Sequence, residues 1–219
     1  MTTHSATIPS PMGNEEKQLT RNWILYGAAI GILADVAYAG IFAPLPDTVR
    51  LYMGMAFGPL LSLAFIGLYH FFKLHRKTVM LQAATVFAVI AGTLVNLMVV
   101  VQSSIYWTIP LGEREGLGLA WDGLNMVQLG MDVSWDIYFS LATMLLGLLM
   151  FRHPRFGTIW GTVALLVGGG LLVLNLATFP DPPGSAGSVD LGPLSGVLYL
   201  FVSIRVLMSL KWVDEKLAQ

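Results

Sequence analysis

The sequence contains no cysteine, which excludes disulfide bonds, thiolate catalysis and cysteine-ligated metal centres. Charged residues are also scarce, at 11% of the chain compared with about 25% in soluble domains. The formal net charge is -1 and the few lysines and arginines are dispersed, so no concentrated basic face for nucleic acid is expected. Hydrophobic residues make up 55% of the 219 residues, a composition that indicates an integral membrane protein.

The predicted fold follows from the apolar runs of the sequence. Each run is close to the length of about 20 residues that a helix needs to cross a bilayer. Short segments with turn-forming residues separate these runs, which occupy residues 22–43, 50–72, 79–107, 123–151, 158–179 and 191–212. We therefore expect an all-α, polytopic bundle of six transmembrane helices. Its single domain spans residues 21–213, between a flexible polar tail at residues 1–20 and a short tail at residues 214–219.

Basic residues predict the orientation of this bundle, because the cytoplasmic connections of membrane proteins are enriched in lysine and arginine. Only Arg50 and Arg114 lie on one side of the predicted bundle. The other side carries nine: Lys17, Arg21, Lys73, Arg76, Lys77, Arg152, Arg155, Lys211 and Lys216. Both termini are therefore expected in the cytoplasm, with the bundle spanning the plasma membrane several times.

Three carboxylates, Asp35, Asp132 and Asp136, lie inside the predicted spans. An acid in the hydrocarbon region costs about 3 kcal/mol on insertion scales, so it needs a proton, a partner or water. Asp132 and Asp136 lie one helical turn apart and repel each other when both are charged, so at least one is expected to hold a proton. Neutral amides join helices with less desolvation, and these acids are therefore the main candidates for function.

A polar stripe runs along the fourth predicted helix. Asn125, Gln128 and Asp132 recur at spacings of three and four residues, which places them on one helix face with Asp136. Trp135 lies between the two acids and is either a packing residue or the wall of a pocket. Because such a face cannot be wholly exposed to lipid, the stripe predicts a polar pocket inside the bundle.

Two asparagines and one arginine are also candidate pocket residues. At about 1.5 Å per residue, Asn96 and Asn175 reach the same depth in the bilayer as the acids. There an amide either joins helices by hydrogen bonds or contacts a ligand. Arg205 either forms a salt bridge with Asp136 or extends along its own side chain to cytoplasmic water. The sequence leaves these alternatives open.

The leading hypothesis is that a small ligand binds, or is translocated, at this pocket in the outer half of the bundle, with proton coupling. An alternative is an intramembrane metal-dependent transferase, because the spacing of Asp132 and Asp136 also suits a divalent cation and a diphosphate. The chain loosely resembles membrane CDP-alcohol phosphotransferases there, but Met126 and Val127 replace the alanine-arginine pair of that signature. A non-catalytic subunit or sensor, acting with a membrane partner or a second copy, is a third alternative.

No catalytic residue, cofactor or metal ligand is predicted. His70 and His75 are five residues apart and do not share a helix face, so they make a poor metal pair. His75 belongs to one basic connection, and His153 is adjacent to a proline in the next. Besides the lipid bilayer and a small-molecule ligand, the expected partners include a second copy of the chain.

Four stretches of the sequence carry a family resemblance: residues 132–136, 152–157, 174–180 and 190–193. Through them the chain resembles an uncharacterised bacterial family of small six-span membrane proteins. The resemblance covers most of the chain after the N-terminal tail. It implies a location in a bacterial plasma membrane, and it implies no activity.

Overall fold

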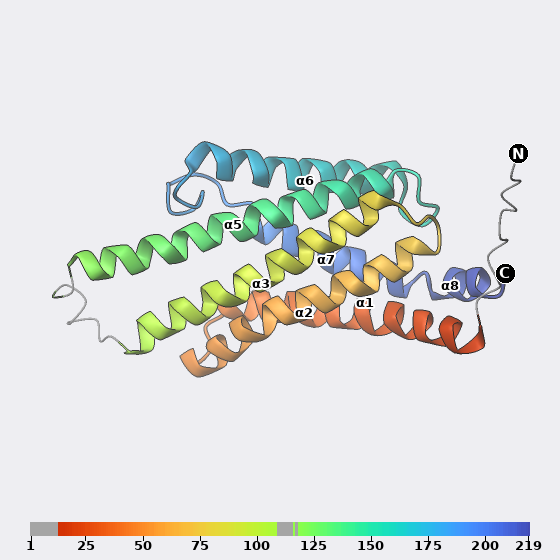
Figure 1. Ribbon diagram of the computed structural model, residues 1–219, viewed down its shortest axis with the longest axis horizontal. Coiled ribbons are helices and arrows are strands. Elements are labelled where there is room, and N and C mark those ends of the chain that lie inside the picture. The colour runs from red at the N-terminus through yellow and green to blue at the C-terminus, as the bar shows by residue number, and fades with distance from the viewer. Residues whose placement is uncertain (1–12, 109–115, 117) are drawn as a thin grey trace, which may run out of the picture.

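The computed structural model describes residues 13–108, 116 and 118–219, with side chains outside residues 104–108. The described residues form a bundle of helices and contain no strand (Figure 1). The helices are α1 (Asn14–Phe42), α2 (Asp47–Lys73), α3 (Val79–Thr108), α5 (Leu119–Met150), α6 (Gly157–Thr178), α7 (Gly192–Leu207) and α8 (Leu210–Leu217). The predicted all-α class is therefore confirmed for this part of the chain.

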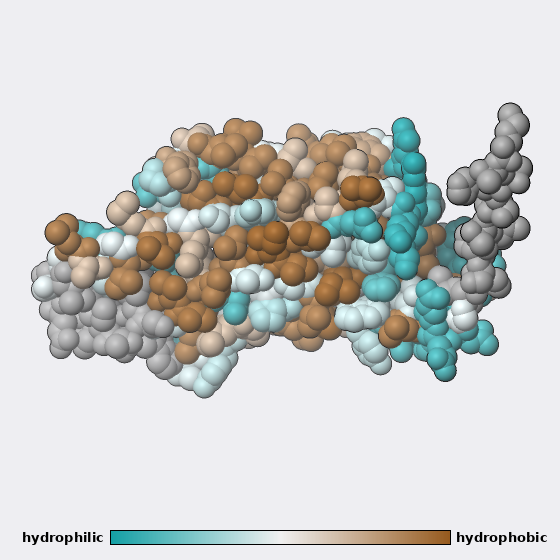
Figure 2. Space-filling view, viewed as in Figure 1, coloured by the Kyte–Doolittle hydropathy of each residue, from teal (hydrophilic) through white to brown (hydrophobic). Residues whose placement is uncertain are grey.

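Five of these helices, α1, α2, α3, α5 and α6, are long and apolar enough to cross a membrane. α7 and α8 meet the same test only as a pair, and the chain bends by 53° between them. The single helix expected over residues 191–212 is therefore wrong, and the structure supports five or six spans. Figure 2 shows hydrophobic residues over the middle of the visible face, as lipid contact requires. The protein is a multi-pass membrane protein embedded in a lipid bilayer.

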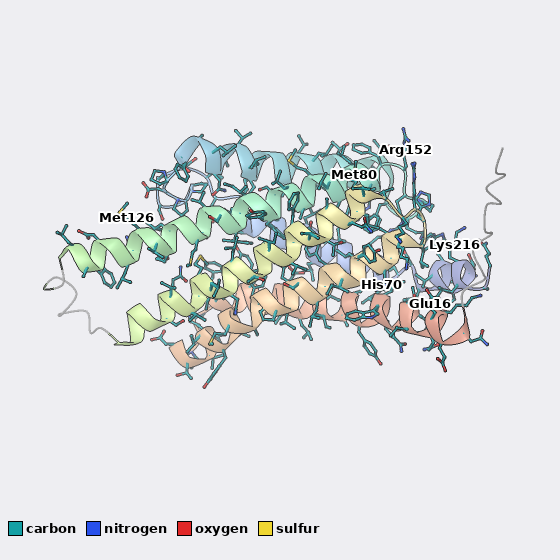
Figure 3. All side chains as sticks on the ribbon, viewed as in Figure 1. Glu16, His70, Met80, Met126, Arg152 and Lys216 are labelled. Atoms are coloured by element: carbon teal, nitrogen blue, oxygen red, sulfur yellow. The ribbon has the colours of Figure 1, made fainter. Side chains whose placement is uncertain are left out.

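The connections between helices define two ends of the bundle. The acidic end consists of the connections at residues 43–46 and 179–191. The basic end consists of the connections at residues 74–78 and 151–156 together with α8. Hydrophilic residues gather at the basic end in Figure 2, and Arg152 extends from it in Figure 3.

The N-terminal boundary differs from the sequence prediction. α1 begins at Asn14, so residues 14–20 are helical and do not belong to the polar tail expected over residues 1–20. Acidic side chains in the first turn favour this helix start, because they lie close to the positive end of the helix dipole. Residues 1–12 lie outside the described part of the chain, as does Arg114 from the orientation argument.

The C-terminal boundary differs as well, because residues 214–217 belong to α8 and not to a tail. The chain turns at Ser209, whose hydroxyl donates a hydrogen bond to the carbonyl oxygen of Arg205 at 2.8 Å. α8 then packs across the basic end. The Nε of Arg21 in α1 donates to Oδ1 of Asp214 in α8 at 2.7 Å, which joins the two helices.

Glycines allow neighbouring helices to approach each other closely. α1 and α2 cross where Gly27 faces Gly67, and a Cβ atom on either residue would overlap the Cα of the other. α2 and α3 cross where Gly58 lies against the carbonyl oxygen of Gly92, so a side chain has no room there either. Such contacts between small residues are a common basis of helix packing in membranes.

α7 contributes its side chains to the centre of the bundle. The ring of Tyr199 lies 4.9 Å from that of Phe65 in α2 and 5.2 Å from that of Phe139 in α5, centroid to centroid. The hydroxyl groups of Tyr199 and Thr143 are 3.0 Å apart and hydrogen-bonded. This packing forms the floor beneath the polar side chains of the acidic end.

Candidate functional site

A cavity of about 310 Å³ lies at the acidic end of the bundle. Its walls come from α1, α2, α3, α5, the connection before α7 and the first residue of α7. The polar wall residues include Gln102, Asp132, Asp136, Ser185 and Asp190. The aromatic wall residues are Tyr38, Phe42, Phe57 and Trp135. A cavity of this size suits a small organic molecule, since pockets for such ligands measure about 300–1,000 Å³.

Asp136 of α5 is the most deeply buried acid of this wall, with a relative exposure of 5%. Its Oδ2 accepts a hydrogen bond of 2.9 Å from Nδ2 of Asn175 in α6, while its Oδ1 is buried without a partner among the described residues. The same amide nitrogen of Asn175 also donates to the carbonyl oxygen of Leu171 at 3.0 Å, which fixes its orientation. One carboxyl oxygen of Asp136 is thus hydrogen-bonded, and the other is buried without a described partner.

Asp132, one turn earlier on α5, is half-buried and has a different partner. Its Oδ1 accepts a hydrogen bond of 2.7 Å from Nε1 of Trp135. This bond orients the indole, which meets Phe57 of α2 edge-on at 6.2 Å and Phe139 at 5.5 Å. Trp135 is 5% exposed and is therefore both a packing residue and a wall of the cavity.

Asp35 of α1 lies beside a second, smaller space of about 10 Å³, which is about the volume that one water molecule requires. Its Oδ2 is buried without a partner among the described residues. Tyr38, Phe57 and Trp135 line both this space and the larger cavity, so these three rings stand between Asp35 and Asp136. The structure thus brings the three predicted acids to one region of the bundle, on two sides of an aromatic wall.

A chain of amide side chains links α3 to α5 at the edge of the cavity. Nε2 of Gln102 donates to Oε1 of Gln128 at 2.7 Å, and Nε2 of Gln128 donates to Oδ1 of Asn125 at 3.0 Å. Gln102 lines the cavity, whereas Asn125 and Gln128 do not. Asn125 and Gln128 are therefore connected to the cavity only through their hydrogen bonds to Gln102 and to each other.

Two predicted site residues lie away from the cavity. Asn96 faces the crossing of α2 and α3, where its Cβ lies against Gly58. Its neighbours Val95 and Met98 line the cavity instead, because they lie on a different face of α3. Arg205 donates from Nε to the carbonyl oxygen of Arg155 at 2.8 Å, in a connection of the basic end. It therefore forms no salt bridge with Asp136.

Most wall residues were not predicted from the sequence, including the polar residues Tyr38, Gln102 and Asp190. Tyr38 lies one turn after Asp35 on α1, a spacing that could have indicated its position. Gln102 lies near the end of a long apolar run, away from the polar stripe of the fourth predicted helix. Asp190 lies in a connection, where its Oδ1 accepts a hydrogen bond of 2.8 Å from the backbone nitrogen of Gly192 at the start of α7. Only the tertiary fold brings Asp190 towards the acids of α5.

The alternative of a metal-dependent transferase gains no support from this geometry. Asp132 and Asp136 bind separate neighbours, Trp135 and Asn175. Within the described ranges, no group of three or more histidine, aspartate or glutamate side chains lies close enough together to hold a metal ion. The acids are instead arranged along the wall of an open space.

His153 is buried at the basic end, where its exposure is 2%. Its ring lies 5.0 to 5.5 Å from surrounding aromatic rings, those of Phe71, Phe72, His75, Phe156 and Trp212. Its Nδ1 accepts a hydrogen bond of 3.2 Å from the backbone nitrogen of Arg155. Burial, with a smaller contribution from the charges of His75 and Arg155, lowers the pKa of His153 to about 3. The imidazole is therefore neutral and belongs to the packing of this end.

The chain matches no protein family, no curated protein and no solved structure in the comparisons made with it. The resemblance to six-span bacterial membrane proteins therefore stays a prediction. Functional assignment depends on the geometry of the cavity.

Proposed function

We propose that this protein binds a small ligand in the cavity of the acidic end and carries it across the membrane. The observation that supports this most directly is Asp136, a carboxyl group that is 5% exposed, borders the cavity and has one oxygen without a partner in the described residues. A buried polar group without a partner is unfavourable, so a ligand or water in the cavity would stabilise it.

Translocation is supported by the second, smaller space behind the aromatic wall. Asp35 lies next to this space, and Tyr38, Phe57 and Trp135 separate it from the cavity. A ligand released inward from Asp136 would meet Asp35 once these rings move. Asp35 therefore serves as an inner site and Asp136 as an outer one.

Proton coupling follows from the placement of Asp132 and Asp136 one helical turn apart near the same cavity. Two adjacent carboxylates repel each other in a poorly hydrated site, so one of them exchanges a proton when the ligand binds or leaves. The expected stoichiometry is one proton for one ligand.

The orientation that accompanies this function places the acidic end outside and both termini in the cytoplasm of a bacterial cell, in agreement with the basic residues at the other end. Since the chain has no cysteine, single cysteines can test this. In intact cells, Ser185→Cys should react with a membrane-impermeant thiol reagent, and Lys216→Cys should react only after the cells are permeabilised. The opposite result would reverse the orientation.

Single cysteines also test the water-filled binding cavity. Met98 lines the cavity and is 9% exposed, whereas its neighbour Leu97 is 46% exposed on the outside of α3. Met98→Cys should react with a charged thiol reagent because its thiol reaches water, while Leu97→Cys should stay unreacted in lipid. If Met98→Cys does not react, the cavity is closed to solvent and the proposal is wrong.

A compound that protects Met98→Cys from the reagent then serves as the transport probe. A pH gradient across proteoliposomes should accelerate its uptake, and Asp136→Asn should abolish that acceleration. Uptake that does not depend on the gradient would contradict proton coupling but would not contradict the binding cavity.

A further inference from the structure

The described wall of the cavity holds carboxyl groups and no cationic side chain. Asp132, Asp136 and Asp190 line the space, and no lysine, arginine or histidine is among the described residues that do. Arg50 is at the acidic end but does not line the cavity, and it donates to the carbonyl oxygen of Ile41 at 2.9 Å and pairs with Asp47 at 3.3 Å, while Arg76 and Arg152 are exposed at the opposite end. Because a carboxylate in a membrane bundle needs a partner or a proton, the missing positive charge is most readily supplied by a ligand.

Asp136 points to this ligand independently of the other acids. It is more than nine-tenths buried, it borders the cavity, and its Oδ1 accepts no hydrogen bond from a described residue. Its Oδ2 already accepts from Asn175 at 2.9 Å. A positive charge in the cavity would therefore lie against the Asp136 side chain and offset its negative charge.

Aromatic rings form much of the remaining wall. The rings of Tyr38 and Phe57 lie 5.0 Å apart, and those of Phe57 and Trp135 lie 6.2 Å apart. The bond from Trp135 to Asp132 holds the indole in place. A cation within about 6 Å of such a ring is attracted to its negative face, most strongly for tryptophan and at sites away from water.

The cavity favours an organic cation over a metal ion. A metal ion such as Ca²⁺ takes six to eight oxygen ligands at about 2.3–2.6 Å, and the described side chains form no cluster of three or more metal-binding residues. The volume of about 310 Å³ and the apolar walls of Val95, Met98 and Val99 instead suit carbon groups around a positive nitrogen.

We propose that the cavity is selective for a small organic cation, an amine or a quaternary ammonium ion, whose charge lies between Asp136 and the aromatic wall. This inference rests on the proposed function, since it names the class of ligand for the same cavity. Asp136 and Asp132 supply the negative charge, and Trp135 supplies the ring that faces the cation.

The experiment measures protection of Met98→Cys from the thiol reagent by matched compounds. The probes are choline, tetramethylammonium and benzyltrimethylammonium, with 3,3-dimethyl-1-butanol as the uncharged analogue of choline. At least one ammonium ion should slow labelling at concentrations at which the uncharged analogue has no effect. Equal protection by choline and its analogue, or no protection by any of the ammonium ions, would overturn the inference.

Three variants assign that protection to the acids. In the Met98→Cys background, Asp136→Asn should raise the concentration needed for half-protection at least tenfold. Asp132→Asn provides a second test should Asp136→Asn fail to fold, because an asparagine oxygen can still accept from Trp135. Asp122→Asn is the matched control, since Asp122 is exposed on the same helix and does not line the cavity. Equal loss in the control would also contradict the inference.

The two proposals fail in distinguishable ways. If Met98→Cys is unreactive while the protein is folded, the solvent-filled cavity is wrong and the ligand class falls with it. If Met98→Cys reacts but charge makes no difference to protection, the cavity stands and only the organic cation is wrong.

Discussion

The two ends of the bundle bury ionisable side chains in different surroundings. At the acidic end, Asp136 is 5% exposed and borders a cavity of about 310 Å³. At the basic end, His153 is 2% exposed and is packed among aromatic rings 5.0 to 5.5 Å away. Each has one polar atom without a partner in the described part of the chain, Oδ1 of Asp136 and Nε2 of His153. Asp136 lines its cavity, whereas His153 does not line the cavity of about 560 Å³ at the basic end, which Phe72 and His75 border.

This comparison separates a candidate binding group from a packing group. An imidazole can be buried in its neutral form. At the basic end, aromatic rings fill the space around it, so no ligand is needed there. A carboxyl group that borders a cavity can gain a hydrogen-bond partner from water or a ligand there. An unpaired buried atom therefore indicates function at the acidic end and structure at the basic end.

The largest expected effect concerns the pH dependence that His153 gives to folding. In the folded protein its pKa is lowered to about 3, whereas in the unfolded chain it is about 6.5. As pH falls from about 6.5 towards 3, the unfolded chain gains a proton that the folded protein does not bind. The free energy of unfolding should therefore fall by about 1.4 kcal/mol per pH unit in this window.

Thermal unfolding in detergent at a series of pH values measures this effect. His153→Phe keeps an aromatic ring in the cluster and removes the titrating group, so its unfolding temperature should decline less below pH 6.5 than that of the parent. His75→Gln is the control, because His75 is exposed and should leave most of the decline in place. Equal slopes for the parent and His153→Phe would show that His153 is protonated in the folded state.

A smaller effect is expected from the amide that holds Asp136. Asn175 is fully buried, and Asn175→Ala removes its bond to Oδ2. Because both carboxyl oxygens would then lack a protein partner, the variant should lose about 1–3 kcal/mol of stability. Asn96→Ala is the matched control, since Asn96 is half-buried, lies away from the cavity and should change stability less.

Chemical denaturation in mixed micelles, followed by near-ultraviolet circular dichroism, measures both asparagine variants. Adding a protecting ammonium ion should restore part of the stability of Asn175→Ala if the cation reaches Asp136. A loss in Asn96→Ala as large as that in Asn175→Ala would mean that asparagine burial, and not the acid, determines the result.

The helical class and the acid cluster were predictable, because apolar length and three-residue and four-residue spacing are properties of single helices. The stripe of α5 and the depth of Asn175 follow from counting along the chain. The helix face on which a residue lies does not follow from such counting. Asn96 has the predicted depth but lies on a face of α3 that does not border the cavity. Counting residues from the helix ends could not decide whether Arg205 lies at the same depth as Asp136. In the structure it donates a hydrogen bond to Arg155 at the basic end.

The sequence also did not predict which residues of the connections between helices are buried. His153 stands between Arg152 and Pro154 in a charged segment, where nothing in the sequence indicates burial. The rings that enclose it include Phe71 of α2 and Trp212 of α8, so its environment depends on contacts between distant segments. Asp190 also lies in a connection, and contacts between distant segments likewise place it in the wall of the cavity.

The smallest expected effect lies between the two ends, at the hydrogen bond between Thr143 of α5 and Tyr199 of α7. Their oxygens are 3.0 Å apart, and Thr143 also donates to the carbonyl oxygen of Phe139 at 2.8 Å, so Tyr199 is the donor to Thr143. Both side chains are buried, at 1% and 6% exposure. Interhelical hydrogen bonds in membranes contribute about 0.6 kcal/mol on average, with a maximum near 1.7.

A double-mutant cycle of Thr143→Val and Tyr199→Phe should therefore give a coupling energy of about 0.6 kcal/mol in the denaturation assay. Tyr69→Phe combined with Thr143→Val is the control, because no hydrogen bond joins that pair and the two effects should add. Tyr199 also lines the small space beside Asp35. A coupling energy well above 1.7 kcal/mol would thus mean that the bond stabilises more than one helix contact, and that the centre of the bundle, like the acidic end, depends on a polar network.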